Sequence, residues 1–292
     1  MSKSWPSTAD ANEAHDCNRG DMKIAFVGGG NMARALIGGL LQRGFAAEGI
    51  SVVEIDAQVR SQLATQFAVH VAEQPGGELQ SSDVVLLAVK PQHMRVVAEK
   101  LGQLLRAQLV VSIAAGVRTA DLSRWLGGYE RIVRAMPNTP ALVLAGISAL
   151  YAGPAVGVAE RERAEEILAA VGTTLWVQQE EQMDAVTAVS GSGPAYVFYF
   201  MEALQEAARE LGLGADEARR LSLQTFSGAA QLAEHSGDDA GVLRERVTSK
   251  GGTTERALSS MNSDELKRKF VEAVKRAAER SRELGEQLGK SN

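Results

Sequence analysis

From residue 22 onward, short apolar runs alternate with longer segments in which apolar residues recur every three or four positions. Continuous apolar runs are typical of strands buried on both faces, and the wider spacing is typical of amphipathic helices. Regular alternation of the two predicts an α/β fold with a parallel, doubly wound sheet of the Rossmann type. We expect strands at 23–27, 50–55, 83–89, 109–113 and 131–134, with helices at 32–44, 57–67, 93–105 and 119–126.

The pattern changes after about residue 180, where strand signals stop. Apolar residues then recur at helical spacing over 197–211 and again over 266–277. Ser263, followed by two acidic residues, is the expected N-cap of the last helix. The second part of the chain is therefore predicted to be all-helical.

These patterns divide the chain into three parts. Residues 1–21 are polar, lack the apolar stretch of a secretory signal and are expected to form a disordered tail, with Met22 as an alternative start. A Rossmann dinucleotide-binding domain is predicted over 22–180 and a helical domain over 181–292. The single cysteine lies in the tail and fits a reducing compartment, so we expect a cytoplasmic protein.

Charge and composition narrow the classes of partner. The net charge of −5 over 292 residues gives no basic surface for nucleic acid. The longest apolar run, at 84–89, is far too short to span a bilayer. The four histidines lack metal-ligand spacing, so no metal site is expected. A small-molecule substrate remains the expected ligand.

The strongest chemical signal is the segment from Gly28 to Ala33, which reads G-x-G-x-x-A after a strand and before a helix. The first glycine permits a tight turn, and Gly30 lets the backbone approach a pyrophosphate at the helix N-terminus. Asn31 and Met32, where that helix is expected to start, belong to the predicted cofactor site.

Two further loops end predicted strands and should face the same cofactor, because ligands of such sheets bind outside the carboxyl ends of strands. Taken alone, Lys90 is better explained as a solvated loop lysine. The cofactor-binding residues expected in these loops are Ala88, Val89, Lys90 and Pro91 in the first and Ala114, Ala115 and Gly116 in the second.

Together with these loops, later motifs resemble the delta-1-pyrroline-5-carboxylate reductase family, and the match runs from residue 22 to the C-terminus. The most specific segments are Met-Pro-Asn-Thr-Pro at 136–140 and Gly-Gly-Thr-Thr at 251–254. Further support comes from Asp-Ala-Val-Thr at 184–187 and Ser-Gly-Ser-Gly-Pro-Ala-Tyr at 190–196. Asn138, within the first segment, is assigned to the cofactor site.

The resemblance implies a definite activity and assembly. Family members reduce a cyclic imine to L-proline, the last step of proline biosynthesis, with a hydride from NADPH or NADH. Their helical domain interlocks with its twin to form a homodimer, and some members build decamers from five dimers. An iminium carbon is already electrophilic, so the absence of a His–Asp or Cys–His pair fits this chemistry.

The substrate carboxylate is the natural handle for positioning the imine. The segment 249–254 offers backbone N–H groups, hydroxyls and, if a threonine opens a helix, a helix N-terminus; the alternative is an ordinary interhelical loop. The resemblance places carboxylate contacts on this segment, at Ser249, Gly252, Thr253 and Thr254. In the family this loop usually reads Ser-Pro-Gly-Gly, but Lys250 stands at the proline position here.

Two residues are candidates for the reacting centre. Thr187 matches the family's threonine near the substrate nitrogen and should orient the ring rather than act as an acid. Glu180 matches a position near the substrate in related enzymes, with a solvated glutamate between the domains as the equal alternative.

Cofactor preference depends on the end of the second predicted strand. An acid there accepts hydrogen bonds from the adenosine ribose and repels a 2′-phosphate. This chain has Glu54 followed by Ile55 and Asp56, with Arg60 as the nearest cation. We expect NADH to be preferred over NADPH; the alternative is that Glu54 turns to solvent and selects nothing.

Two other functions remain open from the residues alone. One is a dehydrogenase of the beta-hydroxyacid type, which would need a lysine in a glycine-rich helical frame. The other is a nucleotide-sensing module without activity, against which the carboxylate-binding segment argues.

Overall fold

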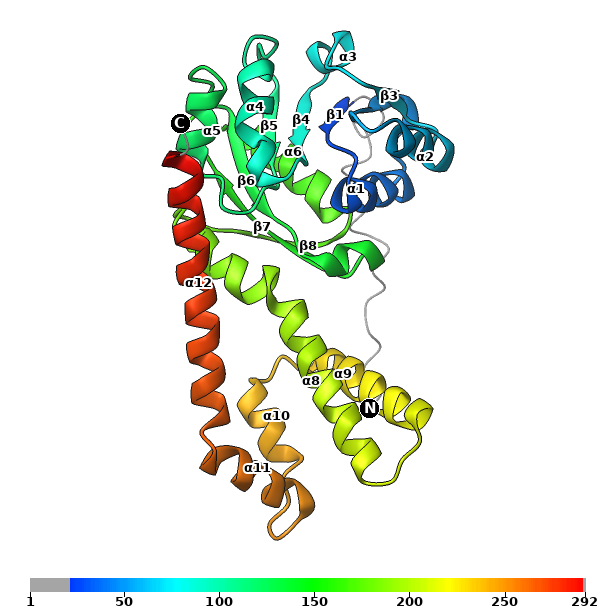
Figure 1. The fold of residues 1–292 in the computed structure, drawn as a ribbon, viewed down its shortest axis with the longest axis vertical. Helices are drawn as coiled ribbons and strands as arrows, with labels where there is room; N and C mark the ends of the chain where they lie inside the picture. The colour runs from blue at the N-terminus through cyan, green and yellow to red at the C-terminus, as the bar shows by residue number, and fades with distance from the viewer. Residues whose placement is uncertain (1–21, 291–292) are drawn as a thin grey trace, which may run out of the picture. The chain divides into compact units, whose positions relative to one another are not determined.

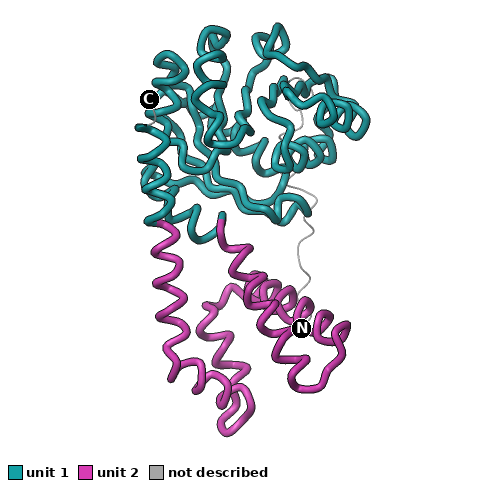
Figure 2. Tube along the Cα trace, in the orientation of Figure 1, with its two compact units in different colours: residues 1–191, 279–292 teal, residues 192–278 magenta. Residues whose placement is uncertain are grey.

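The computed structural model describes residues 22–290, so the predicted tail over 1–21 lies outside the described residues. The chain divides into two compact units (Figure 2). The first combines the described residues up to Gly191 with those from Glu279 onward, and the second is Ser192–Ala278. This contact-based division differs from the predicted ranges 22–180 and 181–292, which stay a prediction about domain function.

An eight-stranded sheet forms the centre of the first unit (Figure 1). Its strand order is β3-β2-β1-β4-β5-β6-β7-β8, and its pairs are parallel except for the antiparallel β6 and β7. The first six strands have the doubly wound order of dinucleotide-binding folds, which confirms the predicted fold class. The strands are β1 (Ile24–Val27), β2 (Ile50–Val53), β3 (His70–Ala72), β4 (Val84–Leu87), β5 (Leu109–Ser112), β6 (Ile132–Met136), β7 (Gly146–Ala152) and β8 (Gly172–Trp176).

Helices cover both faces of this sheet. One buried cluster packs α1, α2 and α6 on one face, and a second packs α3, α4 and α5 on the other. The helices of this unit are α1 (Asn31–Gln42), α2 (Ala57–Phe67), α3 (Gly77–Gln80), α4 (Pro91–Leu101), α5 (Thr119–Trp125), α6 (Val158–Ala169) and α7 (Gln182–Val186), with short 3₁₀ turns η1 (Ala47–Gly49) and η2 (Thr139–Val143) and a π-helical turn η3 (Thr187–Gly191).

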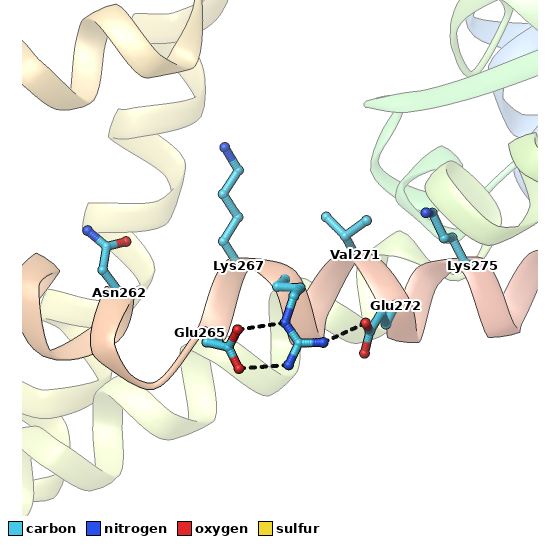
Figure 3. A pocket seen from close by; sticks show the side chains of 7 residues that line it. Asn262, Glu265, Lys267, Val271, Glu272 and Lys275 are labelled. Carbon is cyan, nitrogen blue, oxygen red and sulfur yellow. Dashed lines mark hydrogen bonds and ion pairs between the residues drawn. The ribbon is translucent and has the colours of Figure 1, made fainter.

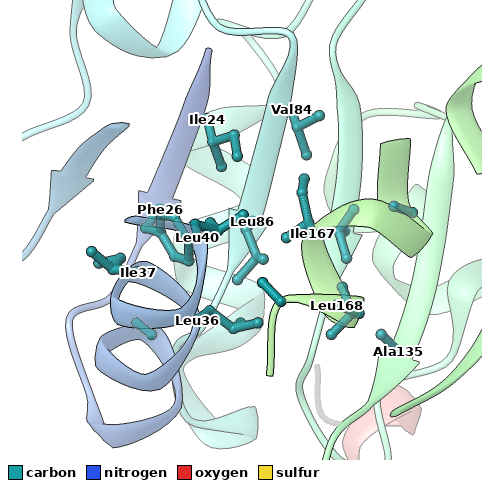
Figure 4. Close-up of a cluster of buried hydrophobic side chains, with 14 of the residues drawn as sticks. Ile24, Phe26, Leu36, Ile37, Leu40, Val84, Leu86, Ala135, Ile167 and Leu168 are labelled. Atoms are coloured by element: carbon teal, nitrogen blue, oxygen red, sulfur yellow. The ribbon is translucent and has the colours of Figure 1, made fainter. Parts of the chain in front are cut away.

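Burial on both faces explains the continuous apolar runs of the sequence. In β1, Ile24 and Phe26 point into one cluster (Figure 4). The residues between and after them, Ala25 and Val27, belong to the other cluster. Successive strand residues face opposite sides, so a strand covered on both sides has no polar position to show.

The second unit is entirely helical, as predicted after residue 180. It contains α8 (Gly193–Glu210), α9 (Ala215–Ser236), α10 (Ala240–Arg246), α11 (Thr253–Ser263) and the first part of α12 (Leu266–Lys290). Edge-to-face aromatic contacts join α8 to α12, with the ring of Phe270 5.7 Å from Tyr196 and 5.6 Å from Phe200 between centroids. Among residues 22–290, every helix is too short or too polar to cross a bilayer.

One local prediction is wrong. Ser263 does not cap the last helix, because it is the final residue of α11 and its hydroxyl donates to the carbonyl of Ser260. The chain turns at Asp264 and at Glu265, whose φ is 54°, before α12 begins. The last turns of α12, from Glu279, then belong to the first unit.

Candidate functional site

In the glycine-rich loop between β1 and α1, Gly28 and Gly30 are glycines for different physical reasons. Gly28 has a φ of 102°, and a Cβ there would lie 2.8 Å from the carbonyl oxygen of Ala88, so the fold itself requires glycine. At Gly30, the N-cap of α1, φ is −69° and an added Cβ would meet nothing within 4 Å. Since packing does not explain Gly30, its missing side chain fits the close approach of a ligand.

The partial positive charge at the N-terminus of α1 is also not neutralised by a nearby side chain. Its N-cap makes no side-chain hydrogen bond, and its first turn carries no acidic residue. Free N–H groups and the positive end of the helix dipole therefore remain for a phosphate. Asn31 and Met32 are the first two residues of this helix, which begins one residue earlier than the predicted start at 32.

Beside this loop lies a hollow of about 610 Å³ at the carboxyl ends of β1, β2 and β4. Six predicted cofactor residues line it: Gly28, Gly30, Glu54, Ala88, Val89 and Lys90. Lys90 is the N-cap of α4 and Pro91 is the first residue of that helix. The residues that sequence reasoning did not assign to it include Ile55, Glu73, Gln74, Gln92, His93, Val96, Val97 and Lys100.

Glu54 turns its side chain toward the glycine-rich loop. One carboxylate oxygen accepts a hydrogen bond from the Gly29 N–H at 2.8 Å, and the other accepts one from the Asp56 N–H at 2.9 Å. The Asp56 carboxylate has a different role: it accepts hydrogen bonds from the N–H groups of Gln58 and Val59 and so caps α2. Two acids therefore hold the end of β2 and the start of α2.

The second predicted loop, after β5, is partly buried and does not line the hollow. Ala114 and Gly116 are buried, while Ala115 is exposed. A Cβ added to Gly285 of α12 would lie 3.0 Å from the carbonyl oxygen of Gly116. The last turns of α12 thus fix the backbone of this loop.

Other bonds hold the end of α12 in place. The Arg124 guanidinium donates to the carbonyl of Gly289 at 2.9 Å, and the Ser281 hydroxyl donates to the Asp184 carboxylate at 2.6 Å. Ser281 itself is buried. The C-terminal turns are therefore an integral part of the first unit.

Asn138, predicted to bind the cofactor, is also engaged within the protein. Its side-chain oxygen accepts from the Ile147 N–H at 2.9 Å, and its amide nitrogen donates to the carbonyl of Ser190 at 3.2 Å. This buried side chain ties the end of β6 to β7 and to the π-helical turn η3. A role for Asn138 in cofactor binding stays a prediction.

The two candidates for the reacting centre lie on either side of α7. Thr187 opens the π-helical turn, and its hydroxyl donates to the carbonyl of Met183 at 2.8 Å. Single π-helical turns occur frequently at functional sites. Because its proton is used within the helix, the Thr187 hydroxyl offers its oxygen as an acceptor.

Both carboxylate oxygens of Glu180 have partners. They accept the Thr119 N–H and hydroxyl, each at 2.7 Å, and one also pairs with the Arg134 guanidinium at 3.2 Å. The Arg134 side chain is only 6% exposed, so this ion pair holds a cation that is nearly buried. Sequence reasoning missed Arg134 and Thr119, since nothing local links residues 46 and 61 positions away from Glu180.

The predicted carboxylate-binding segment lies in the second unit. Thr253 is the first residue of α11 with Gly252 as its N-cap, so a threonine does open a helix there. Gly251, with a φ of 76°, donates its N–H to the Glu255 carboxylate at 2.6 Å. Gly252 donates to the carbonyl of Ser249 at 3.0 Å, which closes the turn around Lys250.

A second hollow of about 480 Å³ lies where α11 turns into α12 (Figure 3). The Arg268 guanidinium bridges the carboxylates of Glu265 and Glu272, and its hydrogen bonds lower the pKa of Glu265 below the usual range. The lining consists mainly of exposed charged side chains on one helix and includes no predicted site residue. Among residues 22–290, no three His, Cys, Asp or Glu side chains gather as metal ligands would.

Comparison with known proteins gives consistent matches. Residues 180–284 match the family described as pyrroline-5-carboxylate reductase dimerisation, and residues 23–116 match the family described as coenzyme F420-dependent NADP oxidoreductase. The chain is 48% identical over 268 residues to pyrroline-5-carboxylate reductase of Pseudomonas aeruginosa, covering 91% of this chain and 98% of that protein.

Solved structures agree. A pyrroline-5-carboxylate reductase from Coxiella burnetii is 42% identical, has a TM-score of 0.86 and is matched over 90% of this chain and 98% of its own. Pyrroline carboxylate reductase of Plasmodium falciparum, solved with NADP bound, is 27% identical with a TM-score of 0.81 and is matched over 91% and 98%.

Proposed function

The chain belongs to the pyrroline-5-carboxylate reductase family, and from this premise we propose that it reduces the C=N bond of 1-pyrroline-5-carboxylate to give L-proline. NAD(P)H, bound at the hollow beside the glycine-rich loop, supplies the hydride. The observation that carries the proposal is Gly30, whose open position at the N-terminus of α1 suits a pyrophosphate. Gly28, Ala88, Val89 and Lys90 complete the surface around it.

Besides binding the cofactor, the protein must hold the imine in the right orientation for hydride transfer. For the substrate carboxylate, the second unit offers the N–H groups and hydroxyls at the N-terminus of α11, with Ser249, Thr253 and Thr254. Thr187 accepts a hydrogen bond from the protonated ring nitrogen, because its own proton is donated to Met183. An acceptor at this place favours the iminium, which is the electrophilic form of the substrate. Glu180 supports this geometry through Arg134 and Thr119 rather than by touching substrate.

The reaction is tested by following cofactor absorbance with purified protein and the cyclic imine. We expect oxidation of NADH and NADPH that depends on the imine, with L-proline as product. Cofactor reduction by a 3-hydroxy acid, with no turnover of the imine, would instead assign the chain to the beta-hydroxyacid dehydrogenase type.

We further propose that NADH is the preferred cofactor. The Glu54 carboxylate lines the hollow and is fixed there by two N–H groups, so it can accept from ribose hydroxyls and repel a 2′-phosphate. Asp56 occupies the N-terminus of α2, where a phosphate could otherwise bind.

Glu54→Ser should shift the ratio of kcat/KM values toward NADPH by about 1–2 kcal/mol, since the site is partly solvated. Glu48→Ser, an exposed acid of η1, is the matched control and should leave the ratio unchanged. Equal or better efficiency with NADPH in the unmutated enzyme would contradict this preference.

The proposed assembly is a homodimer formed through the helical unit, in keeping with the dimerisation family that matches residues 180–284. A decamer of five dimers is the larger assembly to examine by light scattering.

A further inference from the structure

Arg60 is the cation nearest in sequence to Glu54, beside which the adenosine ribose is expected, and its guanidinium is already engaged. One nitrogen donates to the carbonyl oxygens of Glu54 at 2.7 Å and Ile55 at 2.8 Å. The other pairs with the Glu73 carboxylate at 3.3 Å. The first two bonds anchor the arginine to the end of β2, so only the second nitrogen can be redirected toward a ligand.

Glu73 is placed to control that nitrogen. It lies just after β3, it lines the same hollow as Glu54, and its side chain is 63% exposed, whereas that of Arg60 is 19% exposed. The exposed carboxylate thus neutralises a cation whose side chain is mostly covered. Three acids, Glu54, Asp56 and Glu73, lie close to Arg60 at this corner, and their negative charge disfavours a dianionic phosphate beside it. The other cations around the hollow are Lys90 and Lys100 in its lining and Arg34, which donates to the Gly29 carbonyl.

We propose that Glu73 is a specificity-determining residue, which withholds Arg60 from the 2′-phosphate of NADPH and so reinforces the choice of NADH. The inference rests on the proposed function, because it concerns how the same hollow selects its cofactor. It assigns discrimination between the two cofactors to a pair of side chains on α2 and after β3, in addition to Glu54 just after β2. Removing the Glu73 charge should release Arg60 to pair with a 2′-phosphate.

The test measures binding of NADP⁺ and NAD⁺ by isothermal titration calorimetry, without the imine and therefore without turnover. The variants of the full-length protein are Glu73→Gln, Arg60→Gln and the double variant. Glu78→Gln is the matched control, because this acid pairs with His70 at 3.1 Å and does not line the hollow. A thermal melt of each variant verifies that it is folded.

We expect Glu73→Gln to strengthen NADP⁺ binding by about two- to fivefold relative to NAD⁺, the range for partly exposed charge pairs. The gain should vanish when Arg60→Gln is added, and Glu78→Gln should leave the ratio unchanged. The same gain in the Arg60→Gln background would overturn the proposal, since Glu73 would then act only by repulsion. An unchanged ratio in Glu73→Gln would overturn it as well.

The result also separates this inference from the broader one about Glu54. If the unmutated protein binds NADP⁺ more tightly than NAD⁺, the NADH preference fails. The comparison of Glu73→Gln with and without Arg60 still decides whether Glu73 restrains the arginine.

Discussion

The two units of the chain differ sharply in how far their apolar residues are buried. In the first, both faces of the sheet are covered, and residues such as Phe26, Leu36 and Leu86 are 0% exposed. In the second, residues 192–278 are all described, and only Ala218 and Ser222 among them are buried. Phe198 and Tyr199 of α8 are 62% and 68% exposed. The first unit therefore makes its own core, whereas the second presents apolar helix faces.

The many exposed apolar residues on these helices indicate an interaction site, because exposed apolar patches of soluble proteins are usually small. The helices of the second unit keep a helical apolar spacing without a matching buried core. A second copy of the same unit would supply the missing cover, in line with the dimerisation family. The comparison therefore teaches that one unit builds its own core within the chain, whereas the other has apolar helix faces that this chain alone does not cover.

The largest expected effect comes from charging the exposed apolar surface. Phe198→Glu should convert the dimer to a monomer and abolish most activity, because it places a carboxylate where an apolar contact is expected. Size-exclusion chromatography with light scattering measures the mass. Val158→Glu, which is 74% exposed on α6 of the first unit, is the control and should remain dimeric. A dimeric Phe198→Glu, or a monomer with full activity, would contradict the assigned role of this surface.

Glu180→Ala should act on stability within the first unit. It leaves the Arg134 guanidinium without its carboxylate in a place 6% exposed, and removing one partner of a buried pair costs about 3 kcal/mol. Urea unfolding measures the loss, with the adjacent, exposed Glu181→Ala as the control. Unchanged stability with a large fall in kcat would show that Glu180 acts on the substrate instead.

Thr254→Ala should raise the KM for the imine by about ten- to a hundredfold and leave the KM for NADH unchanged. One lost hydrogen bond to a carboxylate is worth roughly 1.5–3 kcal/mol. Steady-state kinetics with each ligand varied in turn separates the two constants. Ser259→Ala, whose hydroxyl donates to a backbone carbonyl within α11, should change neither. An effect confined to the cofactor would move the carboxylate site out of the second unit.

Gly30→Ala should give the reverse result in the first unit. The added methyl meets no protein atom within 4 Å, so the melting temperature should hold, but the KM for NADH should rise about tenfold as the methyl intrudes on the pyrophosphate. Gly28→Ala is the contrasting variant: with φ at 102° and a backbone contact of 2.8 Å, it should lower the melting temperature. Unaltered cofactor binding by Gly30→Ala would refute the assigned place of the phosphates.

The sequence predicted the parts of the fold whose signal is local. Strands β1, β4 and β5 and most of β6 are buried on both faces and therefore appear as apolar runs, whereas β2 is fully buried on one face only. The glycine-rich loop follows the first of these strands. Strands β3, β7 and β8 were not predicted. Two of them, β3 and β8, are edge strands with partly exposed residues, whereas β7 is mostly buried inside the sheet. In β8, Thr174 and Trp176 are satisfied by hydrogen bonds to Glu165, which no periodicity reveals.

The candidate site was predictable in its motifs but not in its contacts. Motif matching identified Glu180 and Asn138, yet their partners Arg134 and Ser190 are set by the tertiary fold. The N-cap assignment of Ser263 failed because a serine followed by acids also fits the end of a helix. The pairing of Arg60 with Glu73 likewise depends on how α2 and β3 meet.

The packing of the last turns of α12 against the first unit affects when that unit can finish folding during synthesis. The Arg124 bond to Gly289 joins residues 165 positions apart, and Leu288 packs against the buried cluster on one face of the sheet. During synthesis the sheet's residues leave the ribosome long before these last turns, at about 5–20 residues per second. Until α12 has been synthesised, the apolar surface that Leu288 covers in the folded protein stays uncovered. Packing of the nucleotide-binding unit can therefore be completed only after nearly all of these residues have been made. Its final closure is a late, long-range folding step, coupled to completion of the helical unit that α12 also enters.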